Sequence, residues 1–351
     1  MTELEALEID IPELDQSAMS AARKRQSILT KPPGSLGRLE ELSVQWAGMR
    51  GHALPAIKRK AVVVMAGDHG VTQEGVSAYP SEVTAQMVHN FLEGGAAINV
   101  LARQAGAEVF VVDLGVASDL GDEPGVIDCR IAPGTANICR GPAMSRAQAV
   151  GSIEAGRTLG RRLSEDGFDL IGTGGMGIGN TTIASALTAA LLAVDVPLVV
   201  GRGTGVDDVG LARKIGAVET ALAINQPDPS NPIEVLAKVG GFEIGGLAGL
   251  ILEAAANRIP VVLDGFITAA AALIAARIAP GARSYMIASH QSVEIGHQLI
   301  LEELGFSPIL DLALRLGEGT GAALAIPIIE SALQTLSGMA TFEGAGVSNR
   351  K

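Results

Sequence analysis

Six short runs of apolar, often β-branched residues alternate along the chain with longer segments of helical character. The runs are AVVVMAG at 61–67, EVFVVDLGV at 108–116, FDLIGTG at 168–174, VPLVVGRG at 196–203, IPVVLDGF at 259–266 and RSYMIAS at 283–289. This alternation predicts an α/β fold with a doubly wound, mostly parallel sheet. The continuous apolarity of the runs indicates that helices cover both faces of the sheet. In such sheets the ligand lies beyond the carboxyl ends of the strands, so we expect the site in the loops that follow these runs.

The two ends of the chain have helical periodicity and no clear strand signal. The helical pattern covers residues 1–50 and 297–340, and the latter range includes PILDLALRL at 308–316. We therefore expect residues 50–296 to form a Rossmann-like α/β domain. Residues 1–49 together with 297–351 should form a smaller helical subdomain, which contributes the GEGTG loop at 317–321.

The charge of the chain argues against a nucleic-acid partner. Lys and Arg number 26 against 38 Asp and Glu, a net charge of −12, and no basic run is interleaved with aromatic residues. This balance does not suit a nucleic-acid surface.

The start MTELEALEIDIPELDQ is acidic and has no apolar signal core, and the longest apolar stretches are interrupted by Gly, Pro or charged residues. We therefore expect a cytoplasmic protein without a membrane segment.

Three glycine-dense loops indicate that the ligand carries a phosphate. They are GTGGMGIGNTT at 172–182, GRGTGVDD at 201–208 and GEGTG at 317–321. Glycines let backbone amides converge at the start of a helix, where free N–H groups and the helix dipole favour an anion. One such loop can equally be a bare structural turn, and it is the repetition that favours phosphate binding.

Two common nucleotide-binding classes lack their motifs here. The first strand run ends in AGDHGV rather than in the GxGxxG of a dinucleotide-dependent oxidoreductase, and no GxxxxGK[ST] of a P-loop kinase occurs. A non-catalytic binding module or regulatory subunit remains an alternative. Such a module would keep the phosphate loops and lose the catalytic base.

Long motifs in the chain resemble one enzyme family. KPPGSLGRLEEL, AGDHGVTQEGVSAYPSEVTAQMVHNFLEGGAAINVLA, GMGIGNTT, GRGTGVDD, KVGGFEIGGLAG, DGF, SHQSVEIGH and GEGTGAALA stand in the order found in nicotinate-nucleotide:dimethylbenzimidazole phosphoribosyltransferases. The likeness runs from about residue 20 to the end of the chain. It implies a pentosyltransferase that makes the α-ribazole phosphate of cobamide (vitamin B12) lower ligands. It also implies a doubly wound sheet with a small helical domain, usually as a homodimer, and no cofactor.

The chemistry of that reaction requires one base. The pyridine nitrogen of nicotinate mononucleotide is already quaternised, so this nitrogen becomes neutral when nicotinate leaves. Departure therefore needs neither a metal nor a general acid. The acceptor must lose an N–H or O–H proton as it attacks the ribose C1′ from the opposite face, which gives an α-linkage. Glu318, between Gly317 and Gly319, matches the catalytic base of the family. Its alternative is a solvated loop carboxylate.

The resemblance also implies two groups of binding residues. Ser77, Tyr79, Gln86 and Met87 match the segment that binds the aromatic acceptor, where two side chains can hydrogen-bond a ring heteroatom and two can contact a flat ring. For Met87, a core position on a helix is equally expected. The phosphate and nucleotide are expected to contact Gly175, Met176, Gly177, Gly179, Asn180, Thr181, Gly203, Thr204, Lys214, Ser292 and Gly317.

Further expectations concern individual residues within and beside this set. Lys214 offers a compact positive charge to the phosphate, and its alternative is an ordinary solvated lysine beside Arg213. His290 and His297 have no third ligand at suitable spacing, so we expect no metal site. Asp68 and His69 directly follow the first apolar run, which favours a place at the strand end over burial in the core.

One position departs from the family pattern. Members that resemble this chain most broadly have a Glu directly before the Met of MGIGNTT, and Gly175 stands there in this chain. Three explanations are open: a variant that uses benzimidazoles with Glu318 alone, a variant for acceptors such as purines, phenol or p-cresol, or a subunit of a heterodimer with a more complete homologous chain. The family includes phenol- and p-cresol-accepting relatives, some built from two homologous subunits.

Overall fold

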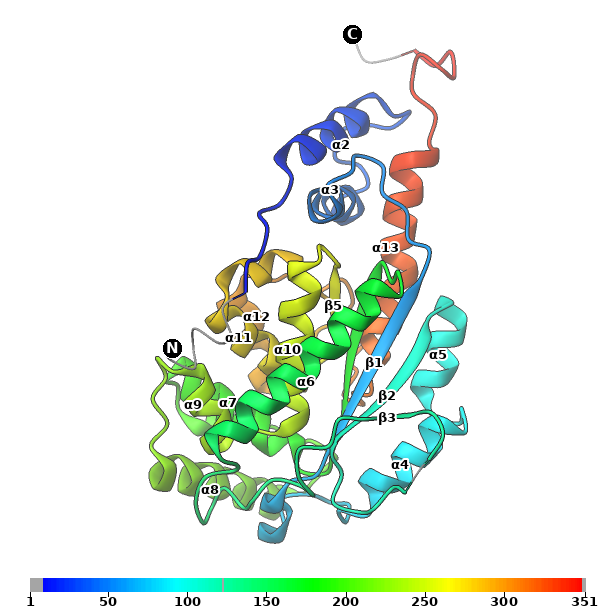
Figure 1. The fold of residues 1–351 in the computed structure, drawn as a ribbon. Coiled ribbons are helices and arrows are strands. Elements are labelled where there is room, and N and C mark those ends of the chain that lie inside the picture. The colour runs from blue at the N-terminus through cyan, green and yellow to red at the C-terminus, as the bar shows by residue number, and fades with distance from the viewer. Residues whose placement is uncertain (1–8, 122, 349–351) are drawn as a thin grey trace.

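The computed structural model describes residues 9–121 and 123–348, and its centre is a six-stranded sheet (Figure 1). All strands are parallel, in the order β3-β2-β1-β4-β5-β6. The strands are β1 (Lys60–Gly67), β2 (Glu108–Gly115), β3 (Val126–Asp128), β4 (Leu170–Met176), β5 (Val261–Leu263) and β6 (Met286–Ala288). The order reverses between β1 and β4, which is the switch point of a doubly wound sheet. The predicted fold class is confirmed.

Helices cover both faces of the sheet, as the apolar strands require. The α-helices are α2 (Gln16–Ile28), α3 (Arg38–Arg50), α4 (Val83–Leu92), α5 (Ala97–Ala105), α6 (Arg146–Glu165), α7 (Asn180–Leu192), α8 (Asp208–Asn225), α9 (Pro232–Val239), α10 (Phe242–Ala256), α11 (Phe266–Ile278), α12 (Ile295–Leu304) and α13 (Thr320–Gly338). Short 3₁₀ helices are η1 (Gly70–Glu74), η2 (Val196–Leu198) and η3 (Pro280–Tyr285). Helices α10 and α11 contact one face, α4, α5 and α13 contact the other, and α6 packs outside α10. No helix in the described part of the chain is long and apolar enough to cross a membrane.

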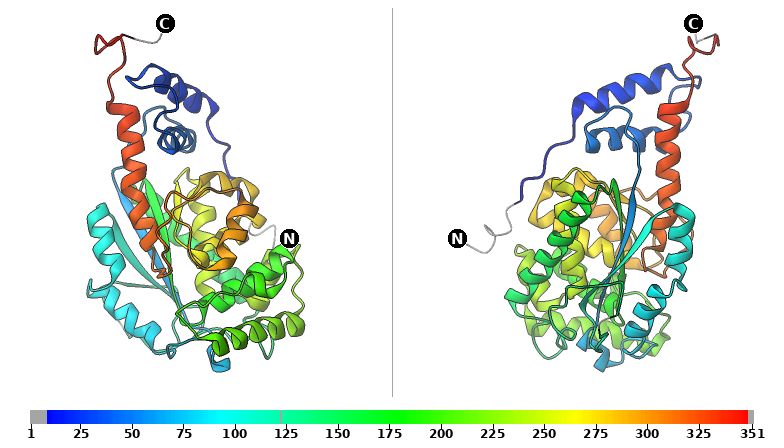
Figure 2. Two further views of the ribbon diagram at one scale, coloured as in Figure 1. Left: turned by 180° about the vertical axis from the view of Figure 1, so that it is seen from behind. Right: turned by 45° about the vertical axis from the view of Figure 1, so that its right-hand side comes forward.

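Helices from the two ends of the chain pack together beside the sheet. α2 packs against α3, and both contact α13, so that helices from the two ends of the described chain lie together (Figures 1 and 2). Arg25 of α2 donates to the carbonyls of Leu336 and Met339 at the end of α13. α12, by contrast, packs against α7 and α11. The domain boundary expected at residue 296 stays a prediction, and residues 1–8 and 349–351 of the expected subdomain lie outside the described residues.

Two segments differ from their predicted secondary structure. The expected strand at 196–203 is wrong, because the chain forms η2 there. Pro197 has no N–H to give to a neighbouring strand, and the carbonyl of Val199 accepts from the Ser185 hydroxyl instead. The expected helix at 308–316 is also wrong. This segment is an irregular loop that runs beside the chain after β6, where Leu310 N–H donates to Ser289 and Val293 N–H donates to Leu314.

Candidate active site

The glycine-rich end of β4 packs against the end of β1 at the switch point of the sheet. Gly177 lies so close to the carbonyl oxygen of Gly67 that a Cβ there would overlap it, and the same Cβ would lie 3.1 Å from Nε2 of His69. The buried Thr84 hydroxyl of α4 accepts from Ile178 N–H at 3.1 Å and so fixes the next residue of the loop. The loop therefore has a fixed position beyond the strand ends, where the sequence predicts that the ligand binds.

The loop 317–319 sits against β4 in an unusual backbone conformation. Gly317, Glu318 and Gly319 all have positive φ, at +84°, +63° and +91°. A Cβ on Gly174 would lie 2.6 Å from the carbonyl carbon of Glu318, so the strand and the loop can approach only because residue 174 is glycine. A positive φ at a non-glycine residue persists only where the surroundings enforce it, and such residues cluster at functional sites.

Asp264, the first residue after β5, holds this loop from the other side. Its carboxylate accepts from Gly319 N–H at 3.0 Å and from Gly321 N–H at 2.7 Å, so it caps the start of α13. Asp264 is 2% exposed, and Nε2 of His290 lies 3.7 Å from its Oδ1. The contact with β4 and the two hydrogen bonds together fix the backbone of Glu318.

Glu318 itself is buried, and its burial raises the pKa of the carboxyl. The side chain is 6% exposed, and its Oε2 has no hydrogen-bond partner among the described residues. Burial raises the pKa of the Glu318 carboxyl to about 7, the backbone N–H of Ile98 in the first turn of α5 opposes this rise, and the charge of Asp264 adds to it. A general base works best when its pKa lies near the working pH. The structure therefore does not place Glu318 in solvent.

Three of the predicted phosphate residues come together near the start of α7. Nζ of Lys214 donates to Oγ1 of Thr181 at 2.7 Å, and a Cβ on Gly203 would lie 2.7 Å from that oxygen and 3.0 Å from Nζ. We call Thr181, Gly203 and Lys214 the phosphate cradle. Lys214 is 1% exposed and is thus not a solvated lysine. Asn180 begins α7. Its N–H and that of Thr182 already donate to the carbonyls of Gly177 and Gly179, so the helix offers an anion mainly the positive end of its dipole.

Burial also changes the charge state of Lys214. It lowers the pKa of the ammonium group to about 8, although the charge of Glu294 acts in the opposite direction. Lys214 is therefore protonated at neutral pH and loses its charge in mildly alkaline solution. An ammonium group has three protons. Two are used, on Thr181 and on the carbonyl of Gly201 at 3.1 Å.

Ser292 lies in the same region, but its hydroxyl is already engaged. Ser292 Oγ donates to the carbonyl of Leu314 at 3.3 Å and accepts from Glu294 N–H at 3.3 Å. Its backbone N–H donates to Nδ1 of His297 at 3.0 Å. Burial is the main cause that lowers the pKa of His297 to about 3, and the neighbouring His290 adds to it. The ring of His297 is therefore neutral and accepts this hydrogen bond. Within the residues that the structure describes, no three His, Cys, Asp or Glu side chains are grouped to hold a metal ion.

The predicted acceptor residues lie on the segment before α4 and on α4 itself. Ser77 Oγ is 3.5 Å from Thr204 Oγ1, and Ala78 N–H donates to the same oxygen at 3.4 Å. This contact joins the acceptor segment to the loop that contains Gly203. Tyr79 is 54% exposed, Gln86 is exposed, and Met87 is half-buried. α4 covers the same face of the sheet as α5 and α13, and the Glu318 loop directly precedes α13.

Gly175 and Gly174 face opposite sides of the sheet. A Cβ on Gly175 would contact Ile267 of α11 at 3.4 Å and Leu247 of α10 at 3.9 Å, which are ordinary packing distances. A Cβ on Gly174 would meet Glu318. A side chain at position 175 therefore starts from the face covered by α10 and α11, and the Glu318 loop lies against the other face.

Sequence reasoning missed three buried acidic residues around the site. Glu243, at the start of α10, is 0% exposed, and its Oε1 lies 3.1 Å from Nε2 of His69. Burial alone would lower the pKa of His69, but Glu243 and then Asp68 outweigh it and raise the pKa. Asp264 and Glu294 are the other two. All three lie inside the quoted motifs KVGGFEIGGLAG, DGF and SHQSVEIGH, and an acidic residue among apolar and glycine neighbours was the available signal.

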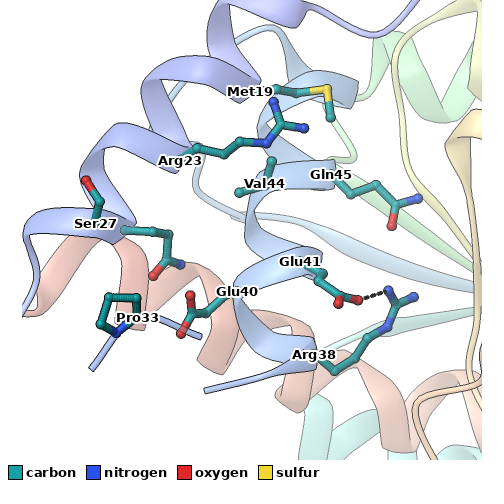
Figure 3. A pocket seen from close by; sticks show the side chains of 10 residues that line it. Met19, Arg23, Ser27, Pro33, Arg38, Glu40, Glu41, Val44 and Gln45 are labelled. Atoms are coloured by element: carbon teal, nitrogen blue, oxygen red, sulfur yellow. Dashed lines mark hydrogen bonds and ion pairs between the residues drawn. The ribbon is translucent and has the colours of Figure 1, made fainter. Parts of the chain in front are cut away.

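A separate hollow of about 470 Å³ lies between α2 and α3, away from the strand ends (Figure 3). Met19 and Arg23 of α2 face Val44, Gln45 and the ion pair of Arg38 with Glu41 on α3. None of the predicted catalytic or binding residues lines it. The hollow is therefore separate from the candidate active site.

Comparisons with known proteins agree over almost the whole chain. The sequence model of a family described as phosphoribosyltransferase matches residues 11–347. The chain is 57% identical to the nicotinate-nucleotide–dimethylbenzimidazole phosphoribosyltransferase of Chloroflexus aggregans over 338 residues, 96% of each protein. It is 56% identical to the Geobacter sulfurreducens protein of the same name, over 95% of each. The crystal structure of the Thermus thermophilus protein superposes with a TM-score of 0.91 at 49% identity, covering 96% of this chain and all of that one.

Proposed function

Because the chain belongs to the nicotinate-nucleotide–dimethylbenzimidazole phosphoribosyltransferase family, we propose that it transfers 5-phosphoribose from nicotinate mononucleotide to dimethylbenzimidazole. The products are an α-linked riboside phosphate, which serves as the precursor of a cobamide lower ligand, and free nicotinate. Full-length identity of 56–57% to two relatives of that name supports this substrate pair.

The observation that carries the proposal is the state of Glu318. A buried carboxyl whose pKa is about 7 and whose backbone is fixed on two sides can accept a proton from the acceptor at neutral pH. The donor needs no acid, because the pyridine nitrogen of nicotinate takes the electron pair of the broken bond and leaves uncharged. The rest of the site has to position the two substrates, which converts a bimolecular attack into an effectively unimolecular one.

The phosphate cradle supports the choice of a phosphorylated donor. Lys214 is charged at neutral pH and its ammonium has a third proton, while the N-terminus of α7 adds the positive end of the helix dipole. Both features favour an anionic group. The ribose and the nicotinate would then extend from the cradle toward Glu318, past Met176 and Gly177 at the end of β4.

Gly175 is compatible with activity of this chain alone. The Glu of other members would start from the face covered by α10 and α11, so its loss leaves the Glu318 loop and its hydrogen bonds intact. We therefore propose a self-sufficient enzyme with Glu318 as its base. The homodimer implied by the resemblance and the cytoplasmic location expected from the sequence remain part of this proposal.

The test is turnover by the purified chain without any partner protein. Nicotinate mononucleotide is offered with dimethylbenzimidazole, adenine, phenol or p-cresol, and chromatography detects nicotinate and the ribosylated product. We expect the highest kcat/KM with dimethylbenzimidazole, and a decrease in kcat of about 10²- to 10⁴-fold in Glu318→Gln. The matched control Glu302→Gln, at an exposed position on α12, should keep wild-type activity.

Two results would contradict the proposal. A preference for phenol or p-cresol would show that the acceptor is misassigned. Folded protein that binds nicotinate mononucleotide but turns over none of the four acceptors would show that a second, homologous subunit is required.

A further inference from the structure

A buried carboxylate, Glu294, joins the loop 201–205 to the phosphate cradle. It directly precedes α12 and is 6% exposed. Its Oε1 accepts from Gly203 N–H at 2.9 Å. Its Oε2 has no hydrogen-bond partner among the described residues, and it lies so close to Gly201 that a Cβ there would overlap it. The loop thus wraps around this carboxylate, and a side chain at position 201 would displace it.

Lys214 is tied to the same loop from the opposite side. Its Nζ donates to the carbonyl of Gly201 at 3.1 Å. Arg315 adds a third contact, because its Nη1 donates to the carbonyl of Gly203 at 3.2 Å. Glu294, Lys214 and Arg315 together hold the loop at Gly201 and Gly203, and Thr204 then follows beside Ser77. The position of this loop therefore depends on all three charged side chains.

We propose that Glu294 is a positioning residue that holds Lys214 and the loop 201–205 in the arrangement that binds the 5′-phosphate of the donor. The inference rests on the proposed function, since it takes nicotinate mononucleotide as the donor. Glu294 does not touch the substrate in this account. It acts through the Gly203 N–H and through the charge that it presents to Lys214.

The charged groups around Lys214 explain why the carboxylate matters. Burial weakens protonation of Lys214, and the charge of Glu294 opposes that effect. The other charged groups near the loop do not favour protonation of Lys214 in this way. Arg315 and Arg213 are positive and donate to the carbonyls of Gly203 and Gly75. Asp208 is negative but is paired with Arg202. Asp207 caps α8 through the N–H of Gly210. Removing the charge of Glu294 should therefore lower the pKa of Lys214 further.

The test is the pH dependence of donor binding in Glu294→Gln. Glutamine keeps the size of the side chain and an oxygen that can accept from Gly203 N–H, but it removes the charge. We expect the KM for nicotinate mononucleotide to rise about twofold at pH 7 and about tenfold at pH 9, with kcat and the acceptor KM within about threefold of wild type at both. The alkaline decrease of kcat/KM for the donor should move about one pH unit lower.

Three further variants make the result decisive. Glu302→Gln, on the exposed side of α12, is the matched control and should leave both KM values and the pH profile unchanged. Glu294→Asp keeps the charge on a shorter side chain, so it should raise the donor KM without moving the alkaline limb. Lys214→Met should abolish that limb. If Glu294→Gln fails to fold, Glu294→Asp still tests whether Glu294 positions the loop, and Lys214→Met still tests whether the alkaline limb belongs to Lys214.

Two outcomes would overturn it. One is a Glu294→Gln enzyme whose donor KM and alkaline limb equal those of wild type. The other is an equal loss for both substrates at every pH, which would show a merely structural role. Failure of wild-type protein to bind nicotinate mononucleotide, measured by calorimetry, would instead contradict the proposed function and is distinguishable from both.

Discussion

The two sides of the candidate site, which we propose bind the donor and the acceptor, are built differently. On the donor side, Lys214 and Glu294 are 1% and 6% exposed and hold their loop through hydrogen bonds of 2.9–3.1 Å. On the acceptor side, Tyr79 is 54% exposed, Gln86 is exposed, and the Ser77–Thr204 contact is 3.5 Å long. A phosphate needs buried, fixed donors because its charge must be matched closely. A flat aromatic base needs mainly apolar contact, which exposed and adjustable side chains can supply.

This contrast indicates how specificity is divided. The donor side is preorganised, so it should accept one kind of anionic ligand and lose affinity sharply when altered. The acceptor side is loosely held, so changes there should be small and should depend on which base is offered. Glu318 belongs to the rigid side, because Asp264 and β4 fix its backbone.

The largest effect should come from Gly174→Ala. The new methyl group would lie 2.6 Å from the backbone of Glu318, so the loop 317–319 has to move. We expect kcat to fall at least about 100-fold, because a displacement of about 1 Å in the catalytic geometry has an effect of that size. Initial rates with saturating substrates measure it, and circular dichroism checks that the variant is folded.

The neighbouring substitution Gly175→Ala is the matched control for this prediction. Its methyl group would meet Ile267 at 3.4 Å, an ordinary contact, and φ at this residue is not positive. We expect kcat within about threefold of wild type, since a compatible Gly→Ala change perturbs little. Equal damage by both substitutions would contradict the claim that only one face of β4 supports the base.

An intermediate effect should follow from Lys214→Met, which keeps the length of the side chain and removes its charge. A hydrogen bond from a charged group contributes about 1.5–3 kcal/mol, so the KM for nicotinate mononucleotide should rise roughly 10- to 100-fold. The KM for dimethylbenzimidazole should stay near its wild-type value. Steady-state kinetics with each substrate varied in turn would check this, and a rise in the acceptor KM alone would assign Lys214 to the wrong side.

The smallest effect should come from Gln86→Ala on the acceptor side. An exposed hydrogen bond contributes about 0.5–1.5 kcal/mol, so kcat/KM for dimethylbenzimidazole should fall roughly 2- to 10-fold while the donor KM is unchanged. The effect should be smaller for phenol, whose ring contains no heteroatom. If the decrease exceeded that of Lys214→Met, the acceptor side would be as rigid as the donor side.

The sequence predicted the sheet well, because buried parallel strands leave a local apolar signal. β1, β2 and β4 fall within one or two residues of their expected runs. Strand β3, with only three residues and partial exposure, leaves no such signal. The expected strand at 196–203 was wrong because Val199 and Val200 are buried without joining the sheet. The helix at 308–316 was wrong because its backbone bonds the chain after β6.

The candidate site was only partly predictable for a related reason. Motif resemblance gave Glu318, Thr181 and Lys214, and the structure brings the last two into contact. It did not give Glu294, because its partner Gly203 is 91 residues away and no local pattern records that pairing. Glu243 was missed for the same reason, because its contact with His69 joins residues that are far apart in the sequence.

The most direct test of the central claim, that Glu318 is the general base, is the pH dependence of kcat/KM for dimethylbenzimidazole at saturating donor. A base must be deprotonated, so activity should fall as pH decreases through the Glu318 pKa of about 7. Glu318→Gln should lose this limb and keep only the titration of the substrates, which is common to both proteins. An acid limb near pH 7 that persists unchanged in Glu318→Gln, at undiminished kcat, would contradict the account.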